Sequence, residues 1–226
     1  MHIIINGVAD IRKLPKFRSE RISQLIYGET FNIIEDLGEF TYIEGGDGVR
    51  GYVKTTNIGE GKERKYKLRD RYRARGKIFP YGSYLSQEDV ERYRIPKRYL
   101  SDLEQEFDMV LEAKKFLGVP YLWGGTSDFG YDCSGMVQRL FKFSRNRIIP
   151  RNSRDQMNAS REVNDFDHAE RGDLIFFKGH VALYMGRGRI IHANGTYSQV
   201  TINNLFDGSK YSEHLKTIFL KIGRFD

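Results

Sequence analysis

The carboxy-terminal half of the chain passes from a helical pattern to a strand pattern, and this order limits the possible folds most. The run "SDLE" at residues 101–104 reads as a capping box, and apolar residues follow at three- and four-residue steps as far as Leu117. A second helix is expected from about Cys133 to Phe143. Consecutive strand-like runs follow, namely "DLIFFKG", "HVALYMG", "RIIHANG", "VTINNL" and "KTIFLKIGRF". This order predicts an α+β domain over residues 102–226, with helices first and an antiparallel sheet after them.

The first sixty residues have a different pattern, because apolar and polar residues alternate between glycine or acidic turns. The strand-like runs are "HIIING", "QLIYGETFNIIEDL", "FTYIEG" and "RGYVKTT". Short strands separated by turns are typical of a small antiparallel barrel. We therefore predict an all-β domain over residues 1–60.

A basic segment joins these two regions, with nine Lys or Arg residues among the sixteen from Lys62 to Lys77. Between Lys65 and Arg73 the basic residues occupy odd positions, and Tyr or Leu occupies most of the even ones. This alternation predicts a solvated edge strand with one charged face. A stripe that binds nucleic acid and a funnel for a small acidic substrate are alternatives. Residues 61–101 as a whole are expected to be a basic linker or a reduced second barrel.

Composition favours a globular protein without a membrane span. The 226 residues are 39% hydrophobic and 30% charged, and no apolar run approaches the roughly 18 residues that a spanning helix needs. The amino terminus lacks the pattern of a secretory signal, so a cytoplasmic location is expected, or a secreted one if a leader was removed. The net charge of +7 would attract acidic partners of any kind.

The chain has one cysteine, Cys133, at the expected start of the second helix and after Gly124, Gly125 and Gly130. A helix start carries partial positive charge that lowers a cysteine pKa from its free value of about 8.5, and the thiolate is the nucleophilic form. Flexible glycine backbone and free N–H groups at the helix start suit an oxyanion site. A small buried hydrophobic residue is the alternative for this cysteine.

A nucleophilic cysteine needs a base, and the base needs an orienting partner. His180 opens one strand-like run and His192 lies in the next, on either side of a turn near Arg187. In an antiparallel hairpin these positions lie almost opposite each other, so the two imidazoles are expected to meet on one face. A purely structural role for His180 is the alternative, and the remaining histidines are expected at the surface. No cysteine and histidine cluster with metal-ligand spacing exists, and this chemistry needs no cofactor.

Three blocks, "PYLWGGTSDFGYDCSGMVQ", "RGDLIFFKGHVALYMG" and "RIIHANG", resemble in order and spacing those of the NlpC-type cysteine peptidases, which cleave bacterial cell-wall peptides. The resemblance covers about residues 102–226 and implies a papain-like α+β domain with the catalytic triad Cys133, His180 and His192. In the amino-terminal region, "YGETF" and "GYV" resemble parts of a bacterial SH3-like barrel.

Both regions together are similar to endopeptidases that cut after γ-D-glutamate, before diaminopimelate or lysine, in short peptides with a free amino-terminal L-alanine. The resemblance thus implies a small substrate derived from peptidoglycan. The lack of a recognisable secretory signal favours murein peptide recycling, and no nucleic-acid partner is expected. It leaves the oligomeric state open. Two alternatives remain: an inactive domain that binds wall peptides or polyanions, and a thiol amidase or acyltransferase with another substrate.

The resemblance also implies substrate-binding positions in both regions. Asp132 is expected to pair with a substrate ammonium, or else to cap the helix, and Arg151 is expected to meet a substrate carboxylate. In the barrel, Glu29 and Tyr52 are expected to close the far end of the cleft, with packing and turn roles as the alternative. The remaining expected positions along the cleft are Tyr121, Ser134 and Ser153.

Overall fold

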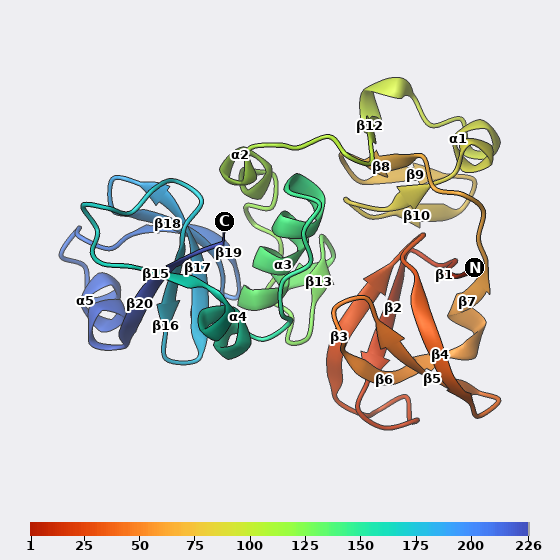
Figure 1. Ribbon diagram of the computed structural model, residues 1–226, viewed down its shortest axis with the longest axis horizontal. Helices are drawn as coiled ribbons and strands as arrows, with labels where there is room; N and C mark the ends of the chain where they lie inside the picture. The colour runs from red at the N-terminus through yellow and green to blue at the C-terminus, as the bar shows by residue number, and fades with distance from the viewer. Residues whose placement is uncertain (226) are drawn as a thin grey trace. The chain divides into compact units, whose positions relative to one another are not determined.

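The computed structural model describes residues 1–225 and shows two compact units. The first unit comprises Met1–Glu106 and the separate segment Trp123–Phe129, and the second comprises Phe107–Leu122 and Gly130–Asp226. The backbone therefore passes from one unit to the other three times (Figure 1). The glycine-rich segment before Cys133 is thus divided between the units.

The first sixty residues form the expected small antiparallel barrel, whose main sheet has the strand order β3-β2-β6-β5-β4. Its core contains fully buried Ile4, Ile11 and Ile43. The run "QLIYGETFNIIEDL" is two strands and not one, because the chain turns at Gly28, whose φ is +78°. The elements are β1 (His2–Ile4), β2 (Val8–Arg12), β3 (Arg21–Ile26), β4 (Phe31–Asp36), β5 (Phe40–Gly45), β6 (Arg50–Lys54), η1 (Thr55–Asn57) and β7 (Ile58–Glu60).

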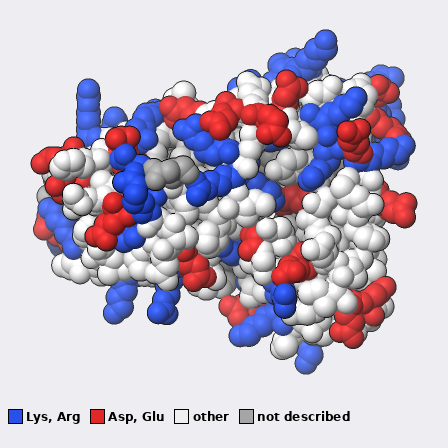
Figure 2. Space-filling model, in the orientation of Figure 1, with Lys and Arg blue, Asp and Glu red and all other residues white. Residues whose placement is uncertain are grey.

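Residues 61–106 contain several short strands and a helix, with an apolar cluster that includes Leu68, Phe79 and Leu85. Strand β8 lies between β11 and β12, and β9 pairs with β10. Figure 2 shows Lys and Arg side chains gathered over this part of the chain, at the upper right. The elements are β8 (Tyr66–Leu68), β9 (Tyr72–Ala74), β10 (Lys77–Phe79), β11 (Tyr84–Leu85), α1 (Gln87–Tyr93), η2 (Lys97–Tyr99) and β12 (Leu100–Asp102).

The prediction of one solvated edge strand over Lys65–Arg73 is wrong. The chain turns between β8 and β9, and β8 is a central strand with partners on both sides. Lys67 is only 1% exposed, and its Nζ donates to the carbonyl oxygen of Gln105 at 3.0 Å. Burial lowers the pKa of this lysine. The alternation of basic residues therefore does not mark a single charged face.

The second unit has a six-stranded antiparallel sheet in the order β15-β20-β16-β17-β18-β19. Helix α3 packs on β17 and β18 through fully buried residues such as Met136, Val137 and Leu140. The five expected strands are β16–β20, whereas β15, α4 and α5 were not predicted. The elements are α2 (Met109–Lys114), β14 (Gly130–Tyr131), α3 (Cys133–Ser144), α4 (Ser153–Ala159), β15 (Arg161–Val163), β16 (Leu174–Phe177), β17 (His180–Gly186), β18 (Arg189–Asn194), β19 (Gln199–Asn204), α5 (Lys210–Thr217) and β20 (Phe219–Arg224).

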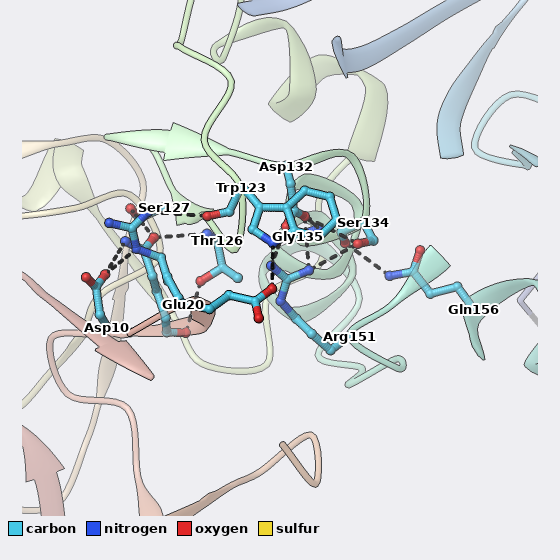
Figure 3. A network of polar contacts seen from close by, with 12 residues as sticks. Asp10, Glu20, Trp123, Thr126, Ser127, Asp132, Ser134, Gly135, Arg151 and Gln156 are labelled. Atoms are coloured by element: carbon cyan, nitrogen blue, oxygen red, sulfur yellow. Dashed lines mark hydrogen bonds and ion pairs between the residues drawn. The ribbon is translucent and has the colours of Figure 1, made fainter. Parts of the chain in front are cut away.

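The segment Trp123–Phe129, which contains β13 (Thr126–Ser127), is bound to the barrel by hydrogen bonds of Gln24. The side-chain oxygen of Gln24 accepts from the backbone N–H of Thr126 at 3.0 Å, and its backbone carbonyl accepts from the Thr126 hydroxyl at 3.0 Å. Arg21 donates to the carbonyl oxygen of Trp123 at 3.2 Å (Figure 3). These contacts explain why the segment belongs to the first unit.

The first helix of the second unit begins later than predicted. Ser101 lies in β12, so "SDLE" is not a capping box, and α2 begins at Met109. Asp108 is its N-cap, because its Oδ1 accepts from the backbone N–H groups of Val110 and Leu111 at 2.8 and 3.0 Å. The Asp108 carboxylate also pairs with Arg171, which lowers its pKa despite the opposing effect of partial burial.

We predict that Asp108→Ala lowers the free energy of unfolding by about 1 kcal/mol, because it removes the acceptor for two N–H groups at the helix start. Glu104→Ala, at the exposed position expected from sequence to complete a capping box, should change it by less than about 0.5 kcal/mol. Urea denaturation followed by circular dichroism measures both. A larger loss for Glu104→Ala would contradict this assignment of the helix start.

Candidate active site

Cys133 is the first residue of α3, as predicted, and its side chain is only 7% exposed. Its sulfur lies within hydrogen-bonding reach of the backbone N–H groups of Ser134 and Val181. Val181 follows His180 directly in β17, so the packing of α3 on that strand brings the thiol beside the histidine-bearing strand. Donors around the sulfur suit a site where negative charge develops.

The thiol of Cys133 is protonated in the resting site. Burial, together with the negative charge of Asp132, raises its pKa to about 11. The N–H groups of Val181 and Ser134 and the charge of Arg151 act in the opposite direction, but they do not outweigh burial. The N–H group of Ser134 at the helix start thus lowers this pKa as expected, but burial outweighs it, so a base is needed to form the thiolate.

His180 and His192 meet as the hairpin pattern predicted. His180 Nε2 lies 2.6 Å from His192 Nδ1, and His192 is fully buried. The strands pair with Leu183 opposite Ile191, and a register shift between Tyr184 and Gly186 precedes the turn. Burial lowers the pKa of both imidazoles, so both are neutral near pH 7. A neutral imidazole can accept a proton from the thiol.

The other ring nitrogen of His192 contacts a residue that the sequence analysis missed. Its Nε2 lies 2.9 Å from Oδ1 of Asn203, which belongs to the neighbouring strand β19. The strand-like run "VTINNL" was recognised, and pairing with the strand of His192 would have placed alternate residues of this run beside that histidine.

Asp132 and Arg151 form a buried ion pair at the start of α3 (Figure 3). Arg151 is 4% exposed, and its two terminal nitrogens donate to the two carboxylate oxygens of Asp132 at 2.6 and 3.0 Å. Asp132 also caps the helix by accepting from the N–H of Gly135 at 2.7 Å. The structure thus shows the capping alternative for Asp132. Arg151 pairs with this internal carboxylate, and its contact with a substrate carboxylate stays a prediction.

Ser134 and Gln156 extend this network. The Ser134 hydroxyl accepts from Arg151 at 3.0 Å, so it faces the ion pair. Gln156, a fully buried residue of α4 that was not predicted, donates to the carbonyl oxygens of Ser134 and Pro150 at 3.0 and 2.8 Å. Ser153 is the half-buried first residue of α4. The amide of Gln156 therefore joins the first turn of α3 to the segment that carries Arg151.

Tyr121 lies near Cys133, since the ionised form of that thiol and the charge of Asp132 both act on its phenol. Burial, which is the largest cause, and these charges raise its pKa to about 12. Its phenol is therefore protonated near neutral pH and can donate a hydrogen bond. The backbone N–H of Tyr121 donates to the carbonyl oxygen of Ser198 at 2.8 Å, which holds this residue beside the start of β19.

Glu29 and Tyr52 have contacts inside the barrel. Glu29 is 1% exposed, and its carboxylate accepts from the backbone N–H of Ile26 at 2.9 Å across the turn. Tyr52 packs against Tyr42 in the neighbouring strand, with ring centroids 4.7 Å apart. These are the turn and packing roles considered as alternatives. A part for either residue in substrate binding stays a prediction.

Two further observations concern the described part of the chain. Within residues 1–225, no group of three or more His, Cys, Asp or Glu side chains is placed to hold a metal ion. None of the helices described has the length and apolar character needed to cross a membrane.

We predict that Arg151→Met lowers the free energy of unfolding by about 3–5 kcal/mol, because it leaves the buried carboxylate of Asp132 without its charged partner. The double variant Arg151→Met with Asp132→Asn should recover part of that loss, since it removes the orphaned charge. Denaturation midpoints of the three proteins measure this. A loss below about 1 kcal/mol for the single variant would contradict a buried pair.

Comparison with family models identifies both regions. The model described as "NlpC/P60 family" matches residues 118–218, which include Cys133, His180 and His192. The model described as "Bacterial dipeptidyl-peptidase Sh3 domain" matches residues 11–58. These matches agree with the resemblances drawn from the sequence blocks.

Two curated relatives extend the comparison. A γ-D-glutamyl-L-lysine dipeptidyl-peptidase of Bacillus cereus is 46% identical over 94 residues, covering 38% of this chain and 28% of that protein. Dipeptidyl-peptidase 6 of Lysinibacillus sphaericus is 26% identical over 227 residues, covering 98% of this chain and 71% of that protein. The chain thus matches less than a third of the length of the Bacillus cereus relative.

Among solved structures, the crystal structure of an NlpC/P60 family protein from Bacillus cereus has a TM-score of 0.81. It is 19% identical, and the match covers 100% of this chain and 99% of that one, so the two share a fold. The chain thus carries a match to a bacterial SH3 domain over residues 11–58, followed by a match to the NlpC/P60 family over residues 118–218.

Proposed function

We propose that this protein is a cysteine endopeptidase that cuts the bond between γ-D-glutamate and a diamino acid in short peptides derived from peptidoglycan. The observation that carries the proposal is the His180–His192 contact of 2.6 Å, on the strand whose Val181 N–H approaches the sulfur of Cys133. Nucleophile, base and orienting residue are thus supplied by two packed elements, α3 and the β17–β18 hairpin.

The first half of the reaction forms an acyl-enzyme. His180 removes the thiol proton of Cys133, and the sulfur attacks the γ-carbonyl carbon of the D-glutamyl residue. N–H groups at the start of α3 and the phenol of Tyr121 stabilise the tetrahedral oxyanion. The intermediate collapses when the carbon–nitrogen bond breaks, and the imidazolium of His180 gives its proton to the leaving amine of the diamino acid.

The second half releases the peptide. His180, neutral again, removes a proton from water, and the hydroxide oxygen attacks the thioester carbon. Collapse of this second intermediate breaks the carbon–sulfur bond, and the proton returns from His180 to the sulfur. The products are a peptide that ends in D-glutamate and a peptide that begins with the diamino acid. His192 holds the ring of His180 in place during both halves.

The names of two relatives support the substrate class. Both are called dipeptidyl-peptidases, and one is named for the γ-D-glutamyl-L-lysine bond. Removal of a dipeptide from the amino end requires a free amino group, here that of L-alanine. We extend the proposal to lysine or diaminopimelate after the scissile bond and to recycling of short wall peptides in the cytoplasm. Cell fractionation tests the location, and recovery only outside the membrane would refute it.

We predict that Cys133→Ala abolishes hydrolysis of L-Ala-γ-D-Glu-L-Lys and L-Ala-γ-D-Glu-diaminopimelate, because it removes the nucleophile. Asn158→Ala, an exposed change in α4, is the matched control and should keep full activity. Mass spectrometry of the products identifies the bond that is cut. The same peptides with an acetylated amino terminus test whether the free amine is required. Other amides and esters test whether the enzyme acts on a different acyl donor or transfers the acyl group to an acceptor other than water.

Full hydrolysis by Cys133→Ala would refute the mechanism. Binding of the peptides without cleavage by the unchanged protein would favour an inactive binding module. Cleavage confined to other amides or esters would favour the amidase or acyltransferase alternative.

The pH dependence of kcat/KM is predicted from the pKa values of His180 and Cys133 in the protein without substrate. The pKa of His180 is lowered by burial, so the neutral base persists below the ordinary histidine value of about 6.5 and is lost as the pH falls further. The pKa of Cys133 is raised to about 11, so the thiol stays protonated through the neutral range. We expect kcat/KM to be level from about pH 6.5 to 9. An acidic midpoint at pH 7 or above would contradict a buried neutral base.

A further inference from the structure

We propose that Asn203 is a positioning residue that sets the tautomers of His192 and His180 and so prepares His180 as the base. This inference rests on the proposed function. It adds a fourth residue behind the expected set of Cys133, His180 and His192, from a strand that carries none of those three.

The geometry places a hydrogen-bond acceptor beside His192 Nε2, the ring nitrogen that does not face His180. His192 lies opposite Thr201 in the β18–β19 ladder, and Asn203 lies two residues further along β19. Oδ1 of Asn203 is 2.9 Å from His192 Nε2 and also accepts from the Thr201 hydroxyl at 3.1 Å. The hydroxyl therefore helps to keep the amide oxygen turned toward this side.

An acceptor in this position determines where the ring protons lie. A carbonyl oxygen cannot donate, so His192 must carry its proton on Nε2 and keep a lone pair on Nδ1. That lone pair accepts from His180 Nε2–H across the 2.6 Å contact. The lone pair of His180 then lies on Nδ1, the remaining ring nitrogen, which is the form that can remove the thiol proton.

The opposite orientation of the Asn203 side-chain amide would prevent His180 from acting as the base. If an amide N–H donated to His192 Nε2, His192 would carry its proton on Nδ1 and donate it to His180 Nε2. His180 would then carry its own proton on Nδ1. Its lone pair, on Nε2, would accept from His192, so no lone pair would be left on Nδ1 to take the thiol proton. The choice between amide oxygen and amide nitrogen at position 203 therefore decides whether the neutral pair is active.

Asn194 is the competitor for the same ring nitrogen, because its Nδ2 lies 3.4 Å from His192 Nε2. This distance is at the limit for a hydrogen bond, whereas the Asn203 contact is 0.5 Å shorter, 2.9 against 3.4 Å. The Asn194 amide also has another partner, the hydroxyl of Tyr211. The shorter contact with Asn203 governs the tautomer.

The remaining groups near His192 do not supply a charge that would replace this function. The ring of Tyr211 lies 6.3 Å from the His192 ring, centroid to centroid, and that of His180 lies 4.9 Å away. Burial lowers the pKa of both histidines and outweighs the hydrogen bond of Asn203, which raises the pKa of His192, so the pair is neutral. An aspartate at position 203 would keep the acceptor but add a negative charge.

The experiment measures ring protonation directly and activity separately. In protein labelled with ¹⁵N-histidine, long-range ¹H–¹⁵N correlation spectra distinguish protonated from bare ring nitrogens. We expect Nε2–H on both His192 and His180 in the unchanged protein near pH 7. Asn203→Ala should lose this uniform tautomer and reduce kcat about 10- to 100-fold with little change in KM.

Asn203→Asp is the conservative variant. It should keep Nε2–H on His192, retain more activity than Asn203→Ala, and move the acidic limb of the pH profile to higher pH, because the carboxylate favours the imidazolium. Ile202→Thr, an exposed change in the same strand, is the matched control and should alter neither readout. Thermal unfolding checks that all variants are folded.

A proton on Nδ1 of His192 in the protein without substitutions would overturn the inference. The inference would also fail if Asn203→Ala kept both the tautomer and the kcat of that protein. If the unchanged protein hydrolyses none of the peptides, the proposed function fails. The spectra still decide whether Asn203 sets the tautomers.

Discussion

The buried ion pair between Asp132 and Arg151 is the interaction on which the rest of the site depends. Asp132 caps α3 while it holds the guanidinium, so one carboxylate determines where the helix starts and how the next segment packs against it. Because Cys133 is the first residue of that helix, the position of its sulfur follows from the pair. A pair this deeply buried tolerates removal of one partner poorly, which ties the fold to the geometry of the site.

Around this pair the site is built to keep its reactive groups neutral. Burial raises the pKa of the thiol and lowers that of both imidazoles, so the charged thiolate–imidazolium form is disfavoured before substrate enters. When the proton moves to His180, the negative charge arises at the sulfur, which N–H donors face. This arrangement also protects the thiol from side reactions, because a protonated, buried thiol is a weak nucleophile.

Much of the catalytic geometry could be predicted from local sequence. The glycine-rich loop before Cys133 and the hairpin between His180 and His192 are short-range patterns, and short-range rules describe them well. The errors arose where tertiary structure overrides local preference. Lys67 alternates with apolar neighbours like a surface residue, yet its strand is central and its ammonium group is satisfied by a carbonyl oxygen. Arg151 acquires its partner only when its segment packs against the start of α3, so its role could not be read from spacing, whereas Asn203 was within reach of a strand-pairing argument that was not made.

The attachment of Trp123–Phe129 to the barrel has a consequence for how the chain folds. Gln24 belongs to the barrel and is synthesised before Thr126, whose backbone N–H its side chain accepts. The loop before the nucleophile is then completed on a template that lies a hundred residues earlier in the chain. Residues 107–226 therefore do not contain every hydrogen-bond partner of this loop. An excised residue range 107–226 would lose the hydrogen bonds that the barrel gives to this loop.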